Sequence, residues 1–407
     1  MWRNVIGAGG RLFAEVQPGP DETAFQLNNT SEAYYNSPYY LKHKDQLQPV
    51  PPPRVNPPRM SLADVVGATT ITAIEAANKI VFHAVGDTGA ATVDRTQTAA
   101  QALAHEARVT DAMAAAVRGG GANAPAFLFH LGDVVYHFGE GQYYYDQFYE
   151  AFRAYDRPIF AIPGNHDGMV FGDAPDRPKV NTLAAFLRNF CAASPGTSPD
   201  VGGLVRSAMT QPGVYFTLDA PFVSIIGLYS NVLDGPGVIS SQGGHYPIGD
   251  EQVAFLKSEL ARLKPLRATR DRAVILAVHH PPASADSKHG GTTGLANDID
   301  AACQSAGLWP DAVLSGHAHL YQRFAHHVAG RDIPYVVAGS GGFAATPPHG
   351  GATPGTTIGG YTLVTAPIVD FGYLTVTVDM TGSKKKLTVS FLSPGRADEH
   401  DSVVVSL

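Results

Sequence analysis

The sequence predicts an α/β protein, and two observations support this fold class. Apolar runs rich in β-branched residues alternate with longer segments of helical character, which is typical of βαβ units. Each of the first runs closes on a glycine followed by a polar residue. Loops after the carboxyl ends of such strands face one crevice in open α/β sheets. We therefore expect several strands to deliver polar side chains to a single site.

The first half of the core supplies three strand units. Strands are expected at residues 80–85, 126–131 and 158–162. An alanine-rich segment at 96–118 is followed by glycines and predicts a long helix, and 143–155 predicts a second helix. Helices of this length suit crossovers between parallel strands.

The second half adds further strands and one helix. Strands are expected at 213–218, 223–228, 273–278 and 312–314, and a helix at 250–263. Segments at 333–337, 373–378 and 387–392 alternate apolar and polar residues and are expected to close a second sheet. Two long glycine-rich loops, 283–298 and 343–360, are expected to act as lids or mobile segments.

The N-terminal region differs from the rest of the chain. Six prolines lie between residues 48 and 58, and proline at this density favours extended chain. We expect a Pro-rich extension over residues 1–60 that packs on one large domain, 61–407. A short helix is expected near 61–66. An insertion at 168–212 is expected to contain another helix at 181–190.

Composition excludes several classes of function. The net charge is −7, and the lysine cluster at 384–386 is the only basic cluster, so no nucleic-acid groove is expected. We find no signal-peptide pattern and no apolar run long enough to span a membrane. This predicts a cytoplasmic location, or a periplasmic or secreted one if a signal peptide had been removed. Cys191 and Cys303 are expected to be buried free thiols. The sequence does not define an oligomeric state.

Five motifs follow one another in the order GDTG, GDVVY, GNHD, HHPP and GHAHLYQR. Each supplies metal-ligating side chains after an expected strand. The candidate ligands are Asp87, Asp133, Tyr136, Asn165, His279, His317 and His319. Two carboxylates, a phenol, an amide and three imidazoles form a ligand set for two adjacent metal ions. Such centres catalyse in-line displacement at phosphorus.

The candidate ligands divide into two sets by their chemistry. Asp87, Asp133 and Tyr136 are hard oxygen donors and suit Fe(III), and His319 would complete this set. Asn165, His279 and His317 are neutral donors and suit a divalent ion such as Zn, Mn or Fe(II). Asp133 is the natural bridge, because one carboxylate can hold two cations close together.

The five motifs together resemble those of the calcineurin-like metallophosphoesterase superfamily, over roughly residues 80–380. The tyrosine in GDVVY resembles purple acid phosphatases in particular, in which this residue binds Fe(III) as a phenolate. The resemblance implies a four-layer α/β/β/α sandwich of two mixed β-sheets flanked by helices. It implies one metal on Asp87, Asp133, Tyr136 and His319, and a second on Asp133, Asn165, His279 and His317. Asp167 and Gln322 stand where glutamate is common in the family.

We expect a dinuclear-metal hydrolase of phosphate esters, with residues 61–407 as its metallophosphoesterase domain. A purple-acid-phosphatase-like phosphomonoesterase is favoured, in which a metal-bound hydroxide attacks a small phosphorylated substrate. Asp133 would bridge the metals, and the resemblance implies that His166 is an outer-sphere residue that contacts the phosphate or the leaving group. The alternative is a phosphodiesterase acting on cyclic nucleotides or other small phosphodiesters, which the HHPP run favours. A non-catalytic metal-binding scaffold would predict lost ligands, and none of the seven is lost.

The remaining histidines have less specific expectations. His83 is expected to be an ordinary surface or core residue, and His130 a core residue. His137 and His280 are expected with equal weight to orient a ligand from behind or to have no role in the site. Lys288, His289 and His349 are expected at solvated loop tips, with contact to the substrate phosphate as the alternative.

Overall fold

The structure is a computed structural model. It describes residues 50–91, 98–136, 138–169, 182–230, 237–241, 248–269, 272–395 and 400–407, and two short paired strands, β1 (Val5–Ile6) and β2 (Leu12–Phe13). Apart from these two strands, residues 1–49 of the expected N-terminal extension lie outside the described residues, as do His137 and positions 170–181 of the insertion.

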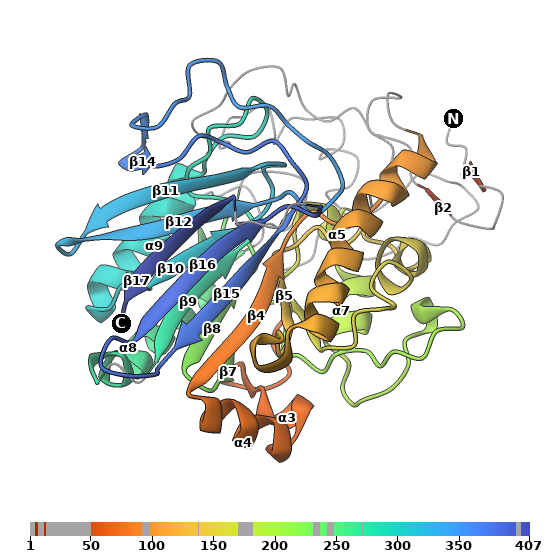
Figure 1. Ribbon diagram of the computed structural model, residues 1–407, viewed down its shortest axis with the longest axis horizontal. Coiled ribbons are helices and arrows are strands. Elements are labelled where there is room, and N and C mark those ends of the chain that lie inside the picture. The colour runs from red at the N-terminus through yellow and green to blue at the C-terminus, as the bar shows by residue number, and fades with distance from the viewer. Residues whose placement is uncertain are drawn as a thin grey trace.

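Two mixed β-sheets form the centre of the fold (Figure 1). The six-stranded sheet has the order β17 (Asp401–Ser406), β16 (Lys386–Leu392), β15 (Tyr373–Asp379), β4 (Lys79–Val85), β5 (Leu128–His130) and β6 (Ile159–Ala161). The nine-stranded sheet has the order β13 (Thr357–Ile358), β14 (Tyr361–Leu363), β11 (Tyr321–Val328), β12 (Arg331–Ala338), β10 (Ala312–Ser315), β9 (Ala273–Val278), β8 (Val223–Leu228), β7 (Phe216–Ala220) and β3 (Arg59–Ser61). Strands β4, β5 and β6 are parallel, as are β8, β9, β10 and β12.

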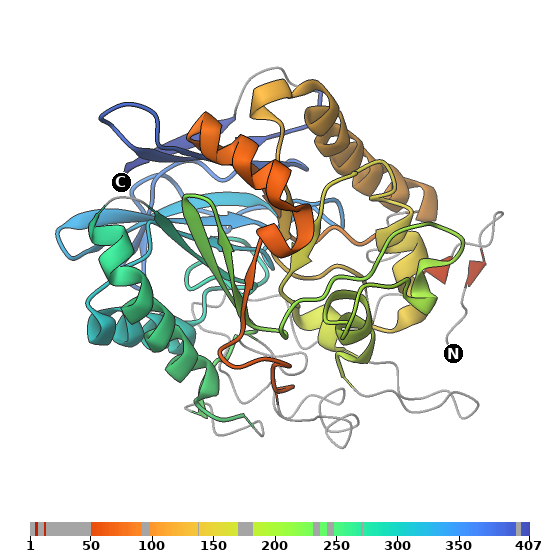
Figure 2. The same ribbon diagram turned by 90° about the horizontal axis from the view of Figure 1, so that it is seen from below.

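The two sheets face each other across a core of buried hydrophobic residues. Phe82 and Phe129 of the six-stranded sheet share this core with Phe216 and Ile275 of the nine-stranded sheet, and the rings of Phe129 and Phe216 stack at 6.0 Å. Helices α5 (Ala99–Gly119) and α7 (Ala184–Phe190) lie on the side of the six-stranded sheet, and α8 (Glu251–Ala268) and α9 (Thr293–Ala306) on the side of the nine-stranded sheet (Figures 1 and 2). The expected four-layer sandwich is therefore confirmed.

Local sequence signals explain where several elements begin and end. Thr98 caps α5, because its hydroxyl accepts the N–H of Gln101 and the Gln101 side chain accepts the N–H of Thr98. The outer edge of β6 is covered by Gln211, whose amide bonds both the N–H and the C=O of Ala161 at 2.8 Å. This contact satisfies backbone hydrogen-bonding groups that the edge strand would otherwise expose.

Cys191 and Cys303 are buried free thiols, as expected.

The expected second sheet is partly wrong. The segment at 333–337 joins the nine-stranded sheet as β12, but 373–378 and 387–392 form β15 and β16 beside β4 in the six-stranded sheet. The alternating apolar residues of β15, Leu374, Val376 and Val378, point into the core between the sheets. Alternation predicts a half-buried strand but does not say which sheet it joins.

Other elements also differ from the expectations. The helix expected at 143–155 is a short 3₁₀ turn, η3 (Gly141–Tyr143), followed by a π-helix, η4 (Tyr145–Tyr149). The loop expected at 283–298 contains the start of α9, and the last residues of the expected extension form β3, which pairs with β7. Short helices α3 (Ala63–Val66) and α4 (Ala68–Ala77) follow β3. No helix within the described ranges combines the length and apolar character that a membrane span needs.

Candidate metal centre

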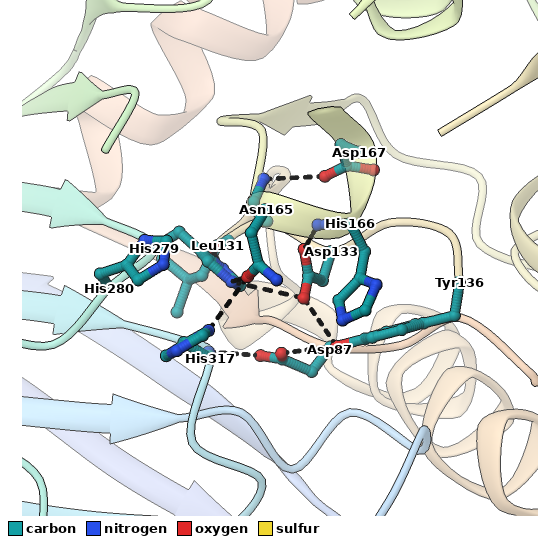
Figure 3. A network of polar contacts seen from close by, with 12 residues as sticks. Asp87, Leu131, Asp133, Tyr136, Asn165, His166, Asp167, His279, His280 and His317 are labelled. Atoms are coloured by element: carbon teal, nitrogen blue, oxygen red, sulfur yellow. Dashed lines mark hydrogen bonds and ion pairs between the residues drawn. The ribbon is translucent and has the colours of Figure 1, made fainter. Parts of the chain in front are cut away.

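The seven candidate ligands meet at the carboxyl ends of strands from both sheets, and Figure 3 labels all of them except His319. Asp87, Asp133 and Asn165 follow β4, β5 and β6, His279 follows β9, and His317 and His319 follow β10. Adjacent parallel strands place their following loops side by side. All seven side chains are buried, and the two most exposed, His317 and His319, are each 7% exposed.

Backbone strain is concentrated in the loops of this site. Asp87, Asp133 and His317 have φ values of 61°, 55° and 68°, in the left-handed region that side chains with a Cβ rarely adopt. Close packing requires glycine beside them, because a Cβ on Gly164 would lie 2.1 Å from Asp133 Oδ1. Strained residues persist where the surrounding structure fixes them, and they cluster at functional sites.

One half of the site consists of oxygen donors and one imidazole. The Tyr136 hydroxyl donates to Asp87 Oδ1 at 2.7 Å and to Asp133 Oδ2 at 2.8 Å. His319 Nε2 lies 3.4 Å from the Tyr136 hydroxyl and 3.6 Å from Asp87 Oδ1. These four side chains are the set expected for the first metal.

The other half consists of neutral donors. Asn165 Oδ1 lies 3.1 Å from His279 Nε2 and 3.0 Å from His317 Nδ1. His279 Nε2 also lies 3.4 Å from Asp133 Oδ2, the oxygen that accepts the Tyr136 hydroxyl. Asp133 therefore stands between the two halves, in the position expected of a bridging ligand.

The donor set fits cations. Donor atoms of Asp87, Asp133 and His279 all lie within 4.8 Å of one another. Among the described residues, neither carboxylate has a lysine or arginine within ion-pair distance. Buried carboxylates require a compensating positive charge, and oxygen and imidazole donors at this spacing can bind metal ions that supply it.

The three imidazoles differ in protonation. Burial lowers the pKa of His279, but the Asp133 carboxylate outweighs burial and raises this pKa to about 9, so the ring must release a proton before Nε2 can bind a cation. Burial lowers the pKa values of His317 and His319 well below the usual 6.5, and neighbouring imidazoles lower them further, so both rings are neutral and carry a free lone pair. Burial raises the pKa of Tyr136 well above 10, and the adjacent carboxylates add to this effect. The phenol therefore needs a strongly Lewis-acidic cation to ionise at neutral pH.

Residues behind the ligands fix their orientation. His279 Nδ1 bonds the backbone oxygen of Leu131 at 2.8 Å, which leaves Nε2 facing the site. Asp167 accepts the N–H groups of Gly164 at 2.8 Å and Val134 at 3.1 Å, and so joins the second and third motifs. His280 is fully buried with its ring 4.2 Å from that of His317, and its Nδ1 bonds the Ser230 hydroxyl at 2.8 Å. His280 therefore packs against the candidate ligand His317.

His130 has a similar role and was expected only as a core residue. Its Nδ1 accepts the N–H of Gly132 at 3.2 Å, so its Nε2 carries the proton and pairs with the Thr88 hydroxyl at 3.0 Å. The ring thereby joins the first and second motif loops.

His166 lies beside the ligands rather than among them. Its backbone N–H donates to Asp133 Oδ1 at 2.8 Å, and its ring lies 4.4 Å from the Tyr136 ring (Figure 3). The side chain is only partly buried, which leaves it accessible beside the oxygen-donor half.

Two further residues lie at the site, of which the sequence offered one only as the less favoured alternative and the other not at all. His289 was expected at a solvated loop tip, but its ring lies 4.6 Å from His317 and 5.0 Å from His319, and Asp286 holds its Nδ1 at 2.9 Å. The Asp286–His289 spacing could have indicated this turn. Phe343 stacks on Tyr136, and the sequence carries no signal for that contact. His349 is exposed, as expected.

Comparison with known proteins identifies the family. The sequence profile of the calcineurin-like phosphoesterase family matches residues 80–321. The chain therefore belongs to this family, whose members use a dinuclear metal centre. The expected class, a metal-dependent hydrolase of phosphoric esters, is confirmed at the level of the family. No curated protein sequence gives a significant match.

The fold is shared with a solved structure from a plant. A purple acid phosphatase from yellow lupin seeds matches with a TM-score of 0.55 at 16% identity, over 81% of this chain and 54% of that chain. This chain thus corresponds to about half the length of the lupin protein. A dimetal phosphatase from Danio rerio gives a TM-score of 0.46 at 12% identity, over 80% of this chain and 98% of that chain.

Proposed function

We propose that the chain is a phosphomonoesterase with Fe(III) at Asp87, Tyr136 and His319 and with Zn, Mn or Fe(II) at Asn165, His279 and His317. One observation carries the proposal. The Tyr136 hydroxyl lies 2.7 and 2.8 Å from two buried carboxylates, which gives this half a third hard oxygen donor. That donor set favours a trivalent ion. The fold shared with a plant purple acid phosphatase supports the same direction.

The chemistry follows from the positions of the side chains. When bound, the two cations would supply an activated water and positive charge for the phosphoryl oxygens. Asp133 stands between the halves. His317 keeps a neutral lone pair for the second cation, and His279 would offer its Nε2 after it releases a proton. His166 lies at the open side of the oxygen-donor half, where it can donate a proton to the leaving group or a hydrogen bond to the phosphoryl group.

His289 is placed to assist on the opposite side. Its ring lies beside His317 and His319, and Asp286 accepts from its Nδ1. This bond orients Nε2 away from Asp286. Two imidazoles, His166 and His289, thus flank the centre, and this arrangement suits a small phosphate ester with several exposed oxygens.

The structure offers less support for the diesterase alternative than for the monoesterase. The alternative rested on the HHPP run, whose second histidine, His280, is fully buried beside His317 and bonded to Ser230. A residue in that position orients a ligand and does not meet a substrate.

A comparison of kcat/KM for a phosphate monoester and the matching diester tests the proposal. The metal-loaded protein is given para-nitrophenyl phosphate or its bis-ester, and metals are quantified in the same preparation. We expect a higher kcat/KM for the monoester with iron present. A higher kcat/KM for the bis-ester in a protein that contains no iron would replace the proposal with the diesterase.

A further inference from the structure

Tyr136 is held from two sides by residues that supply no ligand to the centre. The Phe343 ring lies parallel to the Tyr136 ring, with centroids 3.6 Å apart and planes 3° apart. Gln147 holds the backbone, because its Oε1 accepts the Tyr136 N–H at 2.7 Å and its amide donates to the Tyr136 C=O. Gln147 is fully buried and Phe343 is 5% exposed.

Irregular backbone brings these two residues to Tyr136. Gln147 is in the middle of the π-helix η4, and π-turns occur often at functional sites. Gly89 leaves the necessary space, since a Cβ there would lie 2.7 Å from Gln147 Oε1 and 3.0 Å from the Tyr136 ring. Phe343 lies just after β12, beyond the residues that match the family profile, and its N–H donates to the Asp87 backbone oxygen at 3.1 Å.

We propose that Phe343 and Gln147 are positioning residues that fix the direction of the Tyr136 phenol toward the cation of the oxygen-donor half. Gln147 fixes the backbone from which the side chain starts, and Phe343 fixes the plane of the ring. With both in place, the phenol oxygen can reach only the region between Asp87 and Asp133. This inference deepens the proposed function and rests on it.

The experiment compares matched variants of the iron-loaded full chain. Phe343→Leu removes the stack, Phe343→Tyr keeps an aromatic ring, and Gln147→Leu removes the backbone clamp. Phe391→Leu removes another buried stack, between Phe391 and Tyr321 at 4.4 Å, and Gln211→Leu removes the equivalent clamp on Ala161. The readouts are metal content, the visible phenolate-to-Fe(III) band, kcat and KM.

We expect Phe343→Leu and Gln147→Leu to keep both metals, to shift and weaken the band, and to lower kcat by about tenfold with little change in KM, because misplacement of a reacting group costs rate rather than binding. Phe343→Tyr should restore the band. The two control variants should keep the band and kcat even where they lower thermal stability. An unshifted band and unchanged kcat in both test variants would overturn the inference.

Failure of the proposed function can be distinguished from failure of the positioning role of Phe343 and Gln147. If Tyr136→Phe leaves the band intact, the assignment of Tyr136 as a ligand is wrong, and the inference fails with it. If the iron-loaded protein is colourless, or if Gln147→Leu does not fold, the visible band cannot be compared between both variants. The crystal structure of metal-loaded Phe343→Leu then tests the positioning role by the place of the Tyr136 hydroxyl. A Tyr136 hydroxyl displaced from Asp87 and Asp133 supports the inference, and an unmoved one overturns it.

Discussion

Replacement of His166 by alanine separates a catalytic group from a metal ligand. The backbone N–H of His166 bonds Asp133 Oδ1 and survives the substitution, so the bridging carboxylate keeps its orientation. The imidazole itself is partly buried and touches the Tyr136 ring at 4.4 Å. The substitution removes the acid–base or charge-stabilising contribution of the ring together with its contact with Tyr136.

The magnitude follows from that single contribution. One such group is worth about 10²–10³ in kcat, or roughly 2.7–4 kcal/mol of transition-state stabilisation. We expect His166→Ala to lose this factor while metal content stays near two per chain. His327→Ala is the control, because its exposed imidazole contacts only Asp332 among the interactions described for it.

The assay combines steady-state kinetics on para-nitrophenyl phosphate with metal analysis of the same preparation. Loss of a metal from His166→Ala would make this residue a ligand and refute the reasoning. Unchanged kcat with full metal content would show that His166 contributes nothing to turnover.

Three further outcomes are expected. Strong chelation or Asp133→Ala should lower kcat by at least about 10², because Asp133 serves both cations; full turnover by a preparation shown to be metal-free would refute this. In iron-loaded protein, Tyr136→Phe should bleach the visible band without unfolding the chain, whereas a persisting band would remove Tyr136 from the ligand set. Burial lowers the pKa of His83 from 6.5 to about 3, so its stabilising effect is complete above pH 6.5 and is lost as the pH falls toward 3. His83→Phe should therefore reduce the acid loss of unfolding free energy by about 1.4 kcal/mol per pH unit below 6.5, measured by urea unfolding, and an unchanged slope would show that His83 does not titrate this way.

The sequence predicts where the candidate ligands gather, because metal ligands need particular residue types at strand ends. Gly-Asp and Gly-Asn pairs after apolar runs specify where Asp87, Asp133 and Asn165 must lie. The structure places all seven candidates together, although they come from two different sheets. The residue types of such a candidate ligand set can be recognised in the sequence even when the strands are assigned to the wrong sheet.

The surroundings of the centre are harder to predict. Phe343 and Tyr136 are far apart in the chain, and their contact depends on the path of a loop after β12. The π-helix at Tyr145–Tyr149 replaces an expected α-helix because Gln147 must reach the Tyr136 backbone, a tertiary demand that overrides local propensity. His289 was misjudged for the same reason, since Asp286 and the loop around it bring a polar residue inward.

Two cations that share Asp133 are the central feature of the proposed centre, and anomalous X-ray scattering from crystals of the metal-loaded protein tests them most directly. We predict two anomalous peaks roughly 3.5–4 Å apart. One should lie among Asp87, Tyr136 and His319, the other among Asn165, His279 and His317, with Asp133 between them. A single peak, or two peaks of which neither lies within bonding distance of Asp133, would contradict the two-metal centre.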